Sequence, residues 1–149
     1  MTVTATASSG GRPGTAARAL AAARCAAPPS STDAGAEGSI RALYQAIELG
    51  NFDVLGECFH EQAVYRRPGG APIVSRARIV DYYRRDRAVA TSRILVETIV
   101  SQGAHAVATG LVEGRGREGE PVHEQFADVY EFAEGAVTRR TTYFFRHGF

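Results

Sequence analysis

The feature that most restricts the fold of this chain is an alternating segment between Phe126 and Phe145. Every second position from 126 to 132 is aromatic or acidic: Phe126, Asp128, Tyr130 and Phe132. A Glu-Gly pair follows at 134–135. Side chains that alternate with a period of two are typical of a β-strand, and a two-residue turn containing glycine joins neighbouring strands. The segment therefore predicts an antiparallel hairpin with one aromatic face.

The register of this hairpin decides which side chains share the aromatic face. A two-residue turn at 134–135 places Asp128 opposite Thr141. The interior face then contains Phe126, Asp128, Tyr130, Phe132, Val137, Arg139, Thr141, Tyr143 and Phe145. A bulged turn would instead shift the last strand by one residue and replace Thr141 with Thr142 or Arg140. Asp128 keeps its place among the aromatic residues in either register.

The carboxylate of Asp128 carries most of the functional argument. Removing a carboxylate from water is costly, so its pKa rises unless hydrogen-bond donors or cations compensate. A carboxylate with a raised pKa accepts a proton effectively near neutral pH, for example from a carbon next to a carbonyl group. The alternative is a structural aspartate that is bonded to Thr141 or paired with Arg139. The sequence leaves both interpretations open.

Upstream of the hairpin, the pattern predicts mainly helices and then strands. Apolar residues from Ile40 to Ile47 recur at helical spacing, and Asn51 is positioned to cap a second helix that reaches Phe59. Ser75 is positioned to cap a third helix that ends near Arg87. Strands are predicted at 63–67, 94–101, 104–113, 122–132 and 137–146. This order predicts an α+β fold with helices packed on one face of an antiparallel sheet.

Residues 1–37 differ in composition from the rest of the chain. They are mainly Ala, Ser, Thr, Gly and Pro, with almost no large aliphatic side chains apart from Val3 and Leu20. Such a segment buries too little apolar surface to offset the entropy of ordering it. We therefore predict a disordered extension at 1–37 ahead of one domain at 38–149. Scattered arginines interrupt the apolar stretch that a signal peptide needs, so we expect a cytoplasmic protein.

Composition excludes several classes of function. Seventeen basic residues against sixteen acidic ones give a formal charge of +1, so no basic excess indicates a nucleic-acid partner. No apolar run approaches the roughly 20 residues that a membrane span needs. All the basic residues are arginine, which excludes Schiff-base chemistry on lysine. Cys25 and Cys58 are too few for a Cys-rich zinc site, and no other metal motif is present, so no metal or cofactor is expected.

Two segments resemble a known family. A strand that reads Ala63-Val-Tyr-Arg-Arg-Pro68-Gly69 precedes the third helix, and the closing hairpin contains a Phe-x-Asp-x-Tyr pattern at 126–130. With the order of elements, these segments resemble the SnoaL-like branch of the NTF2-like superfamily between residues 39 and 146. The resemblance implies an α+β, cone-shaped barrel. In it, three N-terminal helices pack on a curved, mainly antiparallel sheet around an apolar pocket. It also implies a homodimer formed through the outer sheet face.

The resemblance further implies an activity. Members named for this branch are cofactor-independent polyketide cyclases with an acid/base aspartate, whose position Asp128 matches. We therefore expect a cyclase or isomerase that acts on an apolar polyketide-like intermediate in natural-product biosynthesis, by an aldol or a pericyclic route. The alternatives are a non-catalytic binding or dimerisation protein, a ketosteroid-isomerase-like enzyme and an epoxide-hydrolase-like enzyme. The last would need a further carboxylate, and the final strand offers none.

The candidate site residues follow from these predictions. Asp128 is expected to be the acid/base residue, with Tyr65 and His60 as secondary catalytic donors. Because Arg66 and Arg67 alternate, one of them faces inward, where it could bind a substrate carboxylate. The substrate is expected to contact mainly aromatic side chains: Tyr44, Phe52, Phe59, Tyr83, Phe126, Tyr130, Thr141, Tyr143 and Phe145.

The remaining charged side chains are expected at the surface. Arg84, Arg85 and Arg87 are predicted to lie on a solvated face of the third helix. The charged segment at 115–120 is predicted to be an exposed hairpin loop, with a lid over the pocket as the alternative.

Overall fold

Helix α2 (Asp33–Glu48) opens the part of the chain that the computed structural model describes, residues 33–145. Ile40, Leu43 and Ile47 recur every three or four residues along it and are at most 4% exposed. They therefore form one apolar face, which packs against the core. Most of the predicted extension lies outside the described residues, but the helix begins at Asp33, ahead of the predicted domain boundary at residue 38.

Two short helices follow, and both begin at the predicted caps. Helix α3 (Phe52–Glu57) begins where the Asn51 side chain accepts a hydrogen bond from a backbone N–H in the first turn. Helix α4 (Arg76–Asp81) begins in the same way at Ser75 and continues into a π-helical turn, η1 (Tyr82–Asp86). Among residues 33–145, no helix is long and apolar enough to cross a membrane.

Six strands form one open, mixed sheet in the order β2-β1-β6-β5-β4-β3. Neighbouring strands are antiparallel except for β1 and β6, which run parallel. The sheet is not closed, so the predicted cone-shaped barrel is confirmed only as a curved, mainly antiparallel sheet with helices. The three helices do not all precede the sheet either, because β1 and β2 lie between α3 and α4. The strands are β1 (Phe59–Arg66), β2 (Ile73–Val74), β3 (Val89–Gln102), β4 (His105–Gly116), β5 (Pro121–Ala133) and β6 (Ala136–Phe144).

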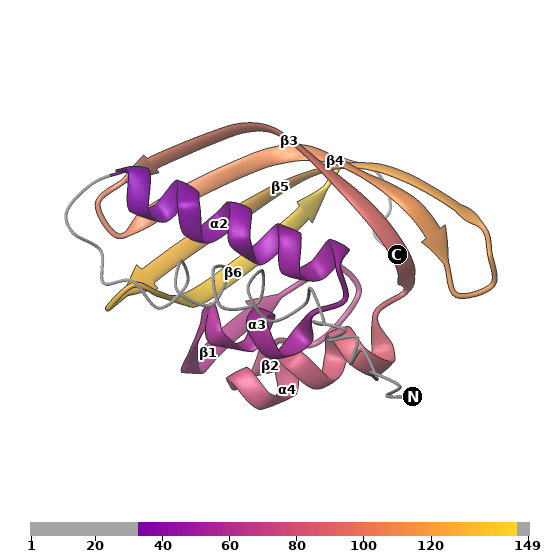
Figure 1. The fold of residues 1–149 in the computed structure, drawn as a ribbon, viewed down its shortest axis with the longest axis horizontal. Helices are drawn as coiled ribbons and strands as arrows, with labels where there is room; N and C mark the ends of the chain where they lie inside the picture. The colour runs from indigo at the N-terminus through magenta and orange to yellow at the C-terminus, as the bar shows by residue number, and fades with distance from the viewer. Residues whose placement is uncertain (1–32, 146–149) are drawn as a thin grey trace, which may run out of the picture.

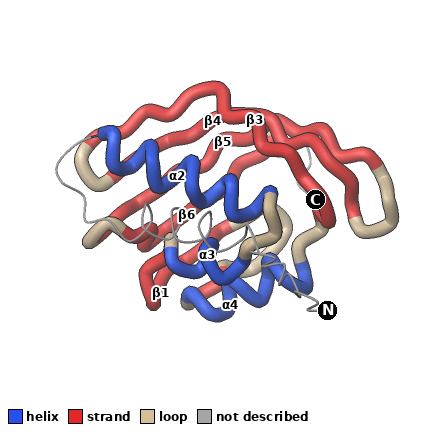
Figure 2. Tube along the Cα trace, in the orientation of Figure 1, coloured by secondary structure: helices blue, strands red, loops and turns tan. Residues whose placement is uncertain are grey.

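The long strands β3 to β6 curve over helix α2, while α3 and α4 lie beside β1 (Figures 1 and 2). The predicted α+β class is confirmed, with the helices on the concave side of the sheet. The core lies between α2 and the inner sheet face, where Leu43, Leu55, Phe59 and Tyr130 are fully buried. Phe59 is the first residue of β1, so the predicted second helix is too long.

The predicted two-residue turn of the closing hairpin is confirmed. Glu134 and Gly135 both have positive φ angles, 51° and 79°, and Ala133 lies opposite Ala136. Two positive φ angles are typical of the tight turns that match the twist of a hairpin. The start of the hairpin therefore has the predicted register.

A bulge then changes that register within the strands. Pairing shifts between Glu131 and Phe132, so that Asp128 lies opposite Thr142 and not opposite Thr141. Because side chains alternate, a shift of one residue exchanges the two faces of β6. Arg140 and Thr142 therefore point inward. The pairing shifts by one residue, as a bulged turn would also have shifted it, but the bulge lies in the strands and not in the turn.

Gly110 allows β3 and β4 to approach each other closely, and its replacement by alanine is expected to destabilise the fold. A β-carbon there would overlap the backbone oxygen of Leu95 and lie 3.1 Å from the Phe126 ring. Because a backbone oxygen in a sheet cannot move aside, we expect a loss of about 1–3 kcal/mol in the free energy of unfolding, measured by urea denaturation. Gly35→Ala is the control, since nothing lies within 4 Å of that position, and it should not destabilise.

Candidate active site

A pocket opens between α2, η1 and the inner face of the sheet. Its empty volume is about 630 Å³, part of which is open solvent. Its polar lining consists of Tyr44, Tyr65, Arg67, Tyr82, Tyr83, Arg87, Asp128, Arg140 and Thr142, and its apolar lining includes Ile47, Val89, Ile94, Val112, Phe126 and Phe144.

Asp128 lies at the centre of the polar lining and is fully buried. Its Oδ2 atom accepts hydrogen bonds from the Tyr44 hydroxyl at 2.7 Å, the Tyr130 hydroxyl at 3.2 Å and the Arg140 guanidinium at 2.6 Å. Its Oδ1 atom accepts a short hydrogen bond from the Thr142 hydroxyl. A carboxylate has about four acceptor positions on its two oxygens. Oδ1, with one donor, therefore retains the capacity to accept a proton.

Arg140 links this carboxylate to a ring of tyrosines. One guanidinium nitrogen donates to the Tyr83 hydroxyl at 2.7 Å, while the guanidinium carbon lies 5.0–5.7 Å from the ring centres of Tyr44, Tyr65 and Tyr130. These distances are typical of cation–π contacts. Only 6% of the Arg140 side chain is exposed. The Asp128–Arg140 pair is thus a buried ion pair enclosed by aromatic rings.

Burial controls the protonation of the groups around the ion pair. Desolvation raises the pKa of the Tyr44 hydroxyl far above its ordinary value, and it raises those of Tyr83 and Tyr130 in the same direction. Burial lowers the pKa of Arg140, but Asp128 and the surrounding tyrosines together more than compensate, so the net shift is upward. The tyrosines are therefore neutral hydrogen-bond donors and Arg140 is a cation across the physiological pH range.

These shifts predict a loss of stability at alkaline pH. In the native state Tyr44, Tyr83 and Tyr130 keep their protons, whereas in the unfolded chain they ionise near pH 10. The unfolded state then binds fewer protons, so the free energy of unfolding falls as pH rises above about 10. Each tyrosine contributes up to about 1.4 kcal/mol per pH unit. Urea denaturation between pH 9 and 11 should show a smaller slope for Tyr44→Phe, and an equal slope would contradict this prediction.

Several predicted site residues do meet at this pocket. Tyr44, Tyr65, Tyr83, Phe126 and Asp128 all line it. Tyr130 reaches it through its hydrogen bond to Asp128. The Tyr65 hydroxyl lies 3.3 Å from the Thr142 hydroxyl, next to the carboxylate.

Other predicted site residues lie elsewhere. His60 is the second residue of β1 and its Nδ1 accepts a hydrogen bond from the Gln62 backbone N–H, so it does not reach the pocket. Phe59 is fully buried in the core, and Phe52 stacks with Tyr83, with ring centres 6.3 Å apart, outside the pocket. For Phe59 and His60 the physical reason is that β1 begins earlier than predicted and replaces the end of the second helix.

The bulge removes three more predicted residues from the pocket. Thr141, Tyr143 and Phe145 do not line it, and Tyr143 and Phe145 are 58% and 73% exposed. Their places on the inner face are taken by Arg140, Thr142 and Phe144. No residue of the sequence clearly predicts the one-residue shift in pairing between β5 and β6. The pattern of Thr and Arg residues in β6 is consistent with either register.

The arginines of the pocket were only partly anticipated. Arg66 is exposed and Arg67 lines the pocket, as the predicted alternation allows. Arg87, predicted on a solvated face, also lines the pocket, and it donates to the Ser92 hydroxyl at 2.9 Å. The Arg117 side chain in the β4–β5 loop donates to the backbone carbonyls of Arg85 and Arg87. This loop is therefore attached beside the pocket.

An open curved sheet whose concave side is covered by helices, with a pocket between them, is also the fold of solved NTF2-like proteins. An NTF2-like protein of unknown function from Burkholderia pseudomallei has a TM-score of 0.66 and 15% identity, over 71% of this chain and 87% of that chain. The LEH-like epoxide hydrolase of M. tuberculosis has a TM-score of 0.64 and 20% identity, over 71% and 79%. A candidate SnoaL-like polyketide cyclase from Jannaschia sp. CCS1 has a TM-score of 0.64 and 13% identity, over 72% and 83%.

Residues 40–140 match the family described as the SnoaL-like domain, and the chain belongs to this family. No curated protein in the comparison matches the sequence. The identities to the solved structures are low, so those similarities establish the fold and leave the reaction to be argued from the site.

Proposed function

We propose that this protein is a cofactor-independent cyclase or isomerase. It would act on an apolar polyketide-like intermediate in natural-product biosynthesis, in the cytoplasm. The observation that carries this proposal is the placement of the Asp128 carboxylate. It is buried, lines a partly open aromatic pocket and has an oxygen with spare acceptor capacity.

The proposed chemistry is proton transfer at a carbon next to a carbonyl group. The Oδ1 atom of Asp128 takes the proton, and the electron pair of the broken C–H bond forms an enolate. In ring closure, the enolate carbon forms a bond to a second carbonyl carbon, and the resulting alkoxide recovers the proton from Asp128. In isomerisation, the proton returns to a different carbon. The Tyr65 hydroxyl, which lies beside Thr142, would donate to the developing oxyanion.

The pocket would contribute by folding the substrate as well as by moving a proton. Apolar side chains such as Ile47, Val112 and Phe126 line it next to Asp128. Holding the two ends of a flexible chain close together can supply a large part of a rate enhancement. A pericyclic closure, which needs no base, would rely on this contribution alone.

A second candidate is a non-catalytic small-molecule binder, and one observation favours it. Four donors already surround the Asp128 carboxylate, as in a structural ion-pair network. Hydrogen bonds to a charged carboxylate stabilise that form and weaken it as a base. This candidate predicts ligand binding without any reaction that depends on Asp128.

The two carboxylates of an epoxide-hydrolase site are not supported. Asp128 contacts Arg140, but among the described pocket residues it is the sole carboxylate. The pocket therefore lacks the second carboxyl group that such a mechanism needs, one to activate water and one to donate a proton.

The test uses deuterium exchange at the carbon next to the carbonyl of 1-tetralone, an aromatic ketone, followed by NMR in heavy water. A catalyst of the proposed kind should accelerate the exchange above the buffer rate, and Asp128→Asn should remove the acceleration. Binding of the ketone to the wild-type protein without acceleration would favour the non-catalytic candidate.

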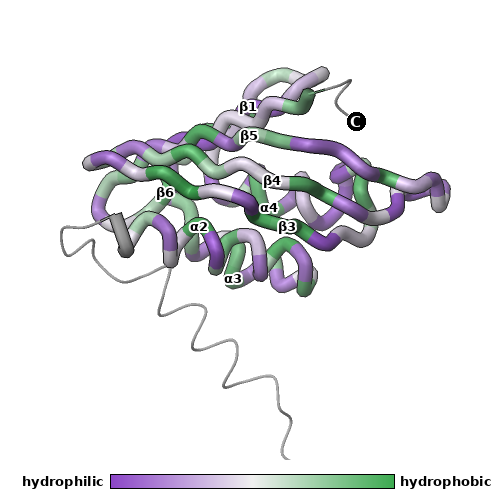
Figure 3. Tube along the Cα trace, turned by 90° about the horizontal axis from the view of Figure 1, so that it is seen from above, coloured by the Kyte–Doolittle hydropathy of each residue, from purple (hydrophilic) through white to green (hydrophobic). Residues whose placement is uncertain are grey.

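We further propose that the protein forms a homodimer through its outer sheet face. Figure 3 shows the strands from above, with apolar and polar stretches along them. Val100, Val107, Val129, Tyr143 and Phe145 are exposed, and the three valines lie side by side across neighbouring strands. Exposed apolar patches of this kind mark interaction sites, and a two-fold axis pairs one patch with its copy. Val129→Arg should shift sedimentation from dimer to monomer, and a monomeric wild type would contradict the proposal.

A further inference from the structure

The charges that line the pocket are unbalanced. Arg140 is neutralised by Asp128, at 2.6 Å. Arg67 and Arg87 line the same pocket, and the ion pairs of residues 33–145 involve neither of them. Arginine stays protonated in proteins, so the pocket carries two positive charges that the described residues do not neutralise.

Arg67 is positioned as a binding group and not as a surface side chain. Its guanidinium lies over the Tyr82 ring, 4.6 Å from the ring centre. Its Nε atom is buried and has no hydrogen-bond acceptor among residues 33–145. A buried donor without a partner costs free energy, which a ligand acceptor would recover. Gly70 leaves room for the guanidinium, because a β-carbon there would lie 2.9 Å from one of its nitrogens.

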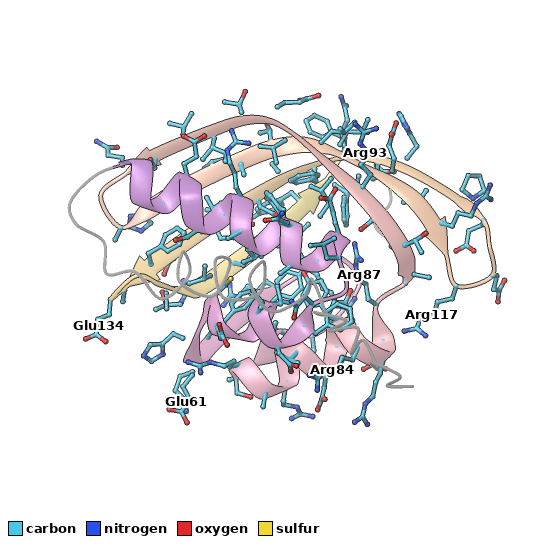
Figure 4. All side chains as sticks on the ribbon, viewed as in Figure 1. Glu61, Arg84, Arg87, Arg93, Arg117 and Glu134 are labelled. Atoms are coloured by element: carbon cyan, nitrogen blue, oxygen red, sulfur yellow. The ribbon has the colours of Figure 1, made fainter. Side chains whose placement is uncertain are left out.

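Arg87 lies on the same side of the pocket. Its guanidinium is 5.7 Å from the Tyr83 ring centre, and the Tyr82 and Tyr83 ring centres are 5.3 Å apart. Figure 4 shows Arg87 at the same end of the molecule as Arg84 and Arg117. Burial lowers the pKa of Arg87, so an anion beside it would relieve the cost of holding this charge away from water.

We propose that the pocket binds an aromatic carboxylic acid, with the carboxylate held by Arg67 and supported by Arg87, and the ring system against the inner apolar wall. A guanidinium fork matches the two oxygens of a carboxylate. Ile94, Val112 and Phe126 supply apolar lining for the rings. The proposal deepens the proposed function, on which it rests, because it names the acidic group of the substrate.

The test compares 2-naphthoate with 2-naphthamide, which has the same rings but no charge. Calorimetric titration of the wild-type protein at low salt should show that the acid binds at least about tenfold more tightly than the amide, as expected for charged hydrogen bonds. Arg67→Gln should remove most of this preference and leave the affinity for the amide nearly unchanged. Raising the salt concentration should weaken the binding of the acid more than the binding of the amide.

Arg66→Gln is the matched control, since it removes the same charge from the neighbouring residue of the chain, which is exposed and does not line the pocket. It should keep the preference for the acid. Equal affinities of the two probes for the wild-type protein would overturn the proposal. So would an equal loss of preference in Arg66→Gln and Arg67→Gln, or failure of both probes to bind.

This experiment separates the inference from the proposed reaction. A preference for the acid without deuterium exchange in 1-tetralone would keep the acid site and reject the cyclase or isomerase. Exchange that depends on Asp128, without a preference for the acid, would keep the reaction and reject the acid site.

Discussion

Arg140→Met should lower the free energy of unfolding by about 3–5 kcal/mol, the cost of removing one partner from a buried ion pair. The substitution leaves the Asp128 carboxylate, which is fully buried, without its cation. It also removes the guanidinium N–H that donates a hydrogen bond to the Tyr83 hydroxyl. Methionine has a similar length, so the effect should come from the uncompensated charge more than from a cavity. Urea denaturation at pH 7 measures it.

The neighbouring Arg139 provides a matched control. It pairs with Glu131 at 3.1 Å on the exposed side of the sheet, where ion pairs contribute about 0–1 kcal/mol. Arg139→Met should therefore have a small effect. Adding Asp128→Asn to Arg140→Met should restore part of the lost stability, because the buried charge is then gone. Equal losses for the two single arginine variants would contradict this account of the ion pair.

Asp128→Asn should reduce the catalysed deuterium exchange of 1-tetralone by about 10²–10⁴-fold, the usual contribution of one proton-transferring side chain. The carboxamide keeps the shape of the carboxylate and an oxygen that can accept from Arg140. Ketone binding, measured by titration, should therefore change little. A loss of exchange with retained binding distinguishes a missing base from a damaged pocket.

Two further variants sharpen this measurement. Glu131→Gln makes the same acid-to-amide change on the same strand, but outside the pocket, and should keep the wild-type rate. Thr142→Val removes the hydroxyl that donates a hydrogen bond to Oδ1 of Asp128, the oxygen proposed to accept the proton. This variant should alter the pH dependence of the exchange. An Asp128→Asn protein that is folded and exchanges as fast as the wild type would reject the acid/base role.

The position of Asp128 could be predicted because it depends on one strand alone. Phe126, Asp128 and Tyr130 alternate within β5, so the inward direction of the aspartate follows from the apolar side chains beside it. The helix caps at Asn51 and Ser75 were predictable for the same reason, since each acts on the next few residues of the chain.

The hydrogen-bond partners of Asp128 depend on contacts between different helices and strands, and such contacts are harder to predict from the sequence. Arg140 faces inward because of a bulge in β6, and both registers give a plausible alternation. Arg87 lies just after a π-helical turn, which departs from the ordinary helical period used to place it on a solvated face. The predicted position of His60 is wrong because β1 begins at Phe59. The apolar residues up to Phe59 are equally consistent with the end of a helix, which is what was predicted there.

The tyrosine that donates to Asp128 from α2 is 84 residues away in sequence, and the arginine that neutralises it is on β6. During synthesis on the ribosome, α2 and β5 are therefore made before the cation that they require. Until β6 emerges, a nascent chain that buried this acid would hold a lone negative charge in an aromatic environment. Burial of Asp128 with a compensated charge therefore requires β6, which brings Arg140 to the carboxylate.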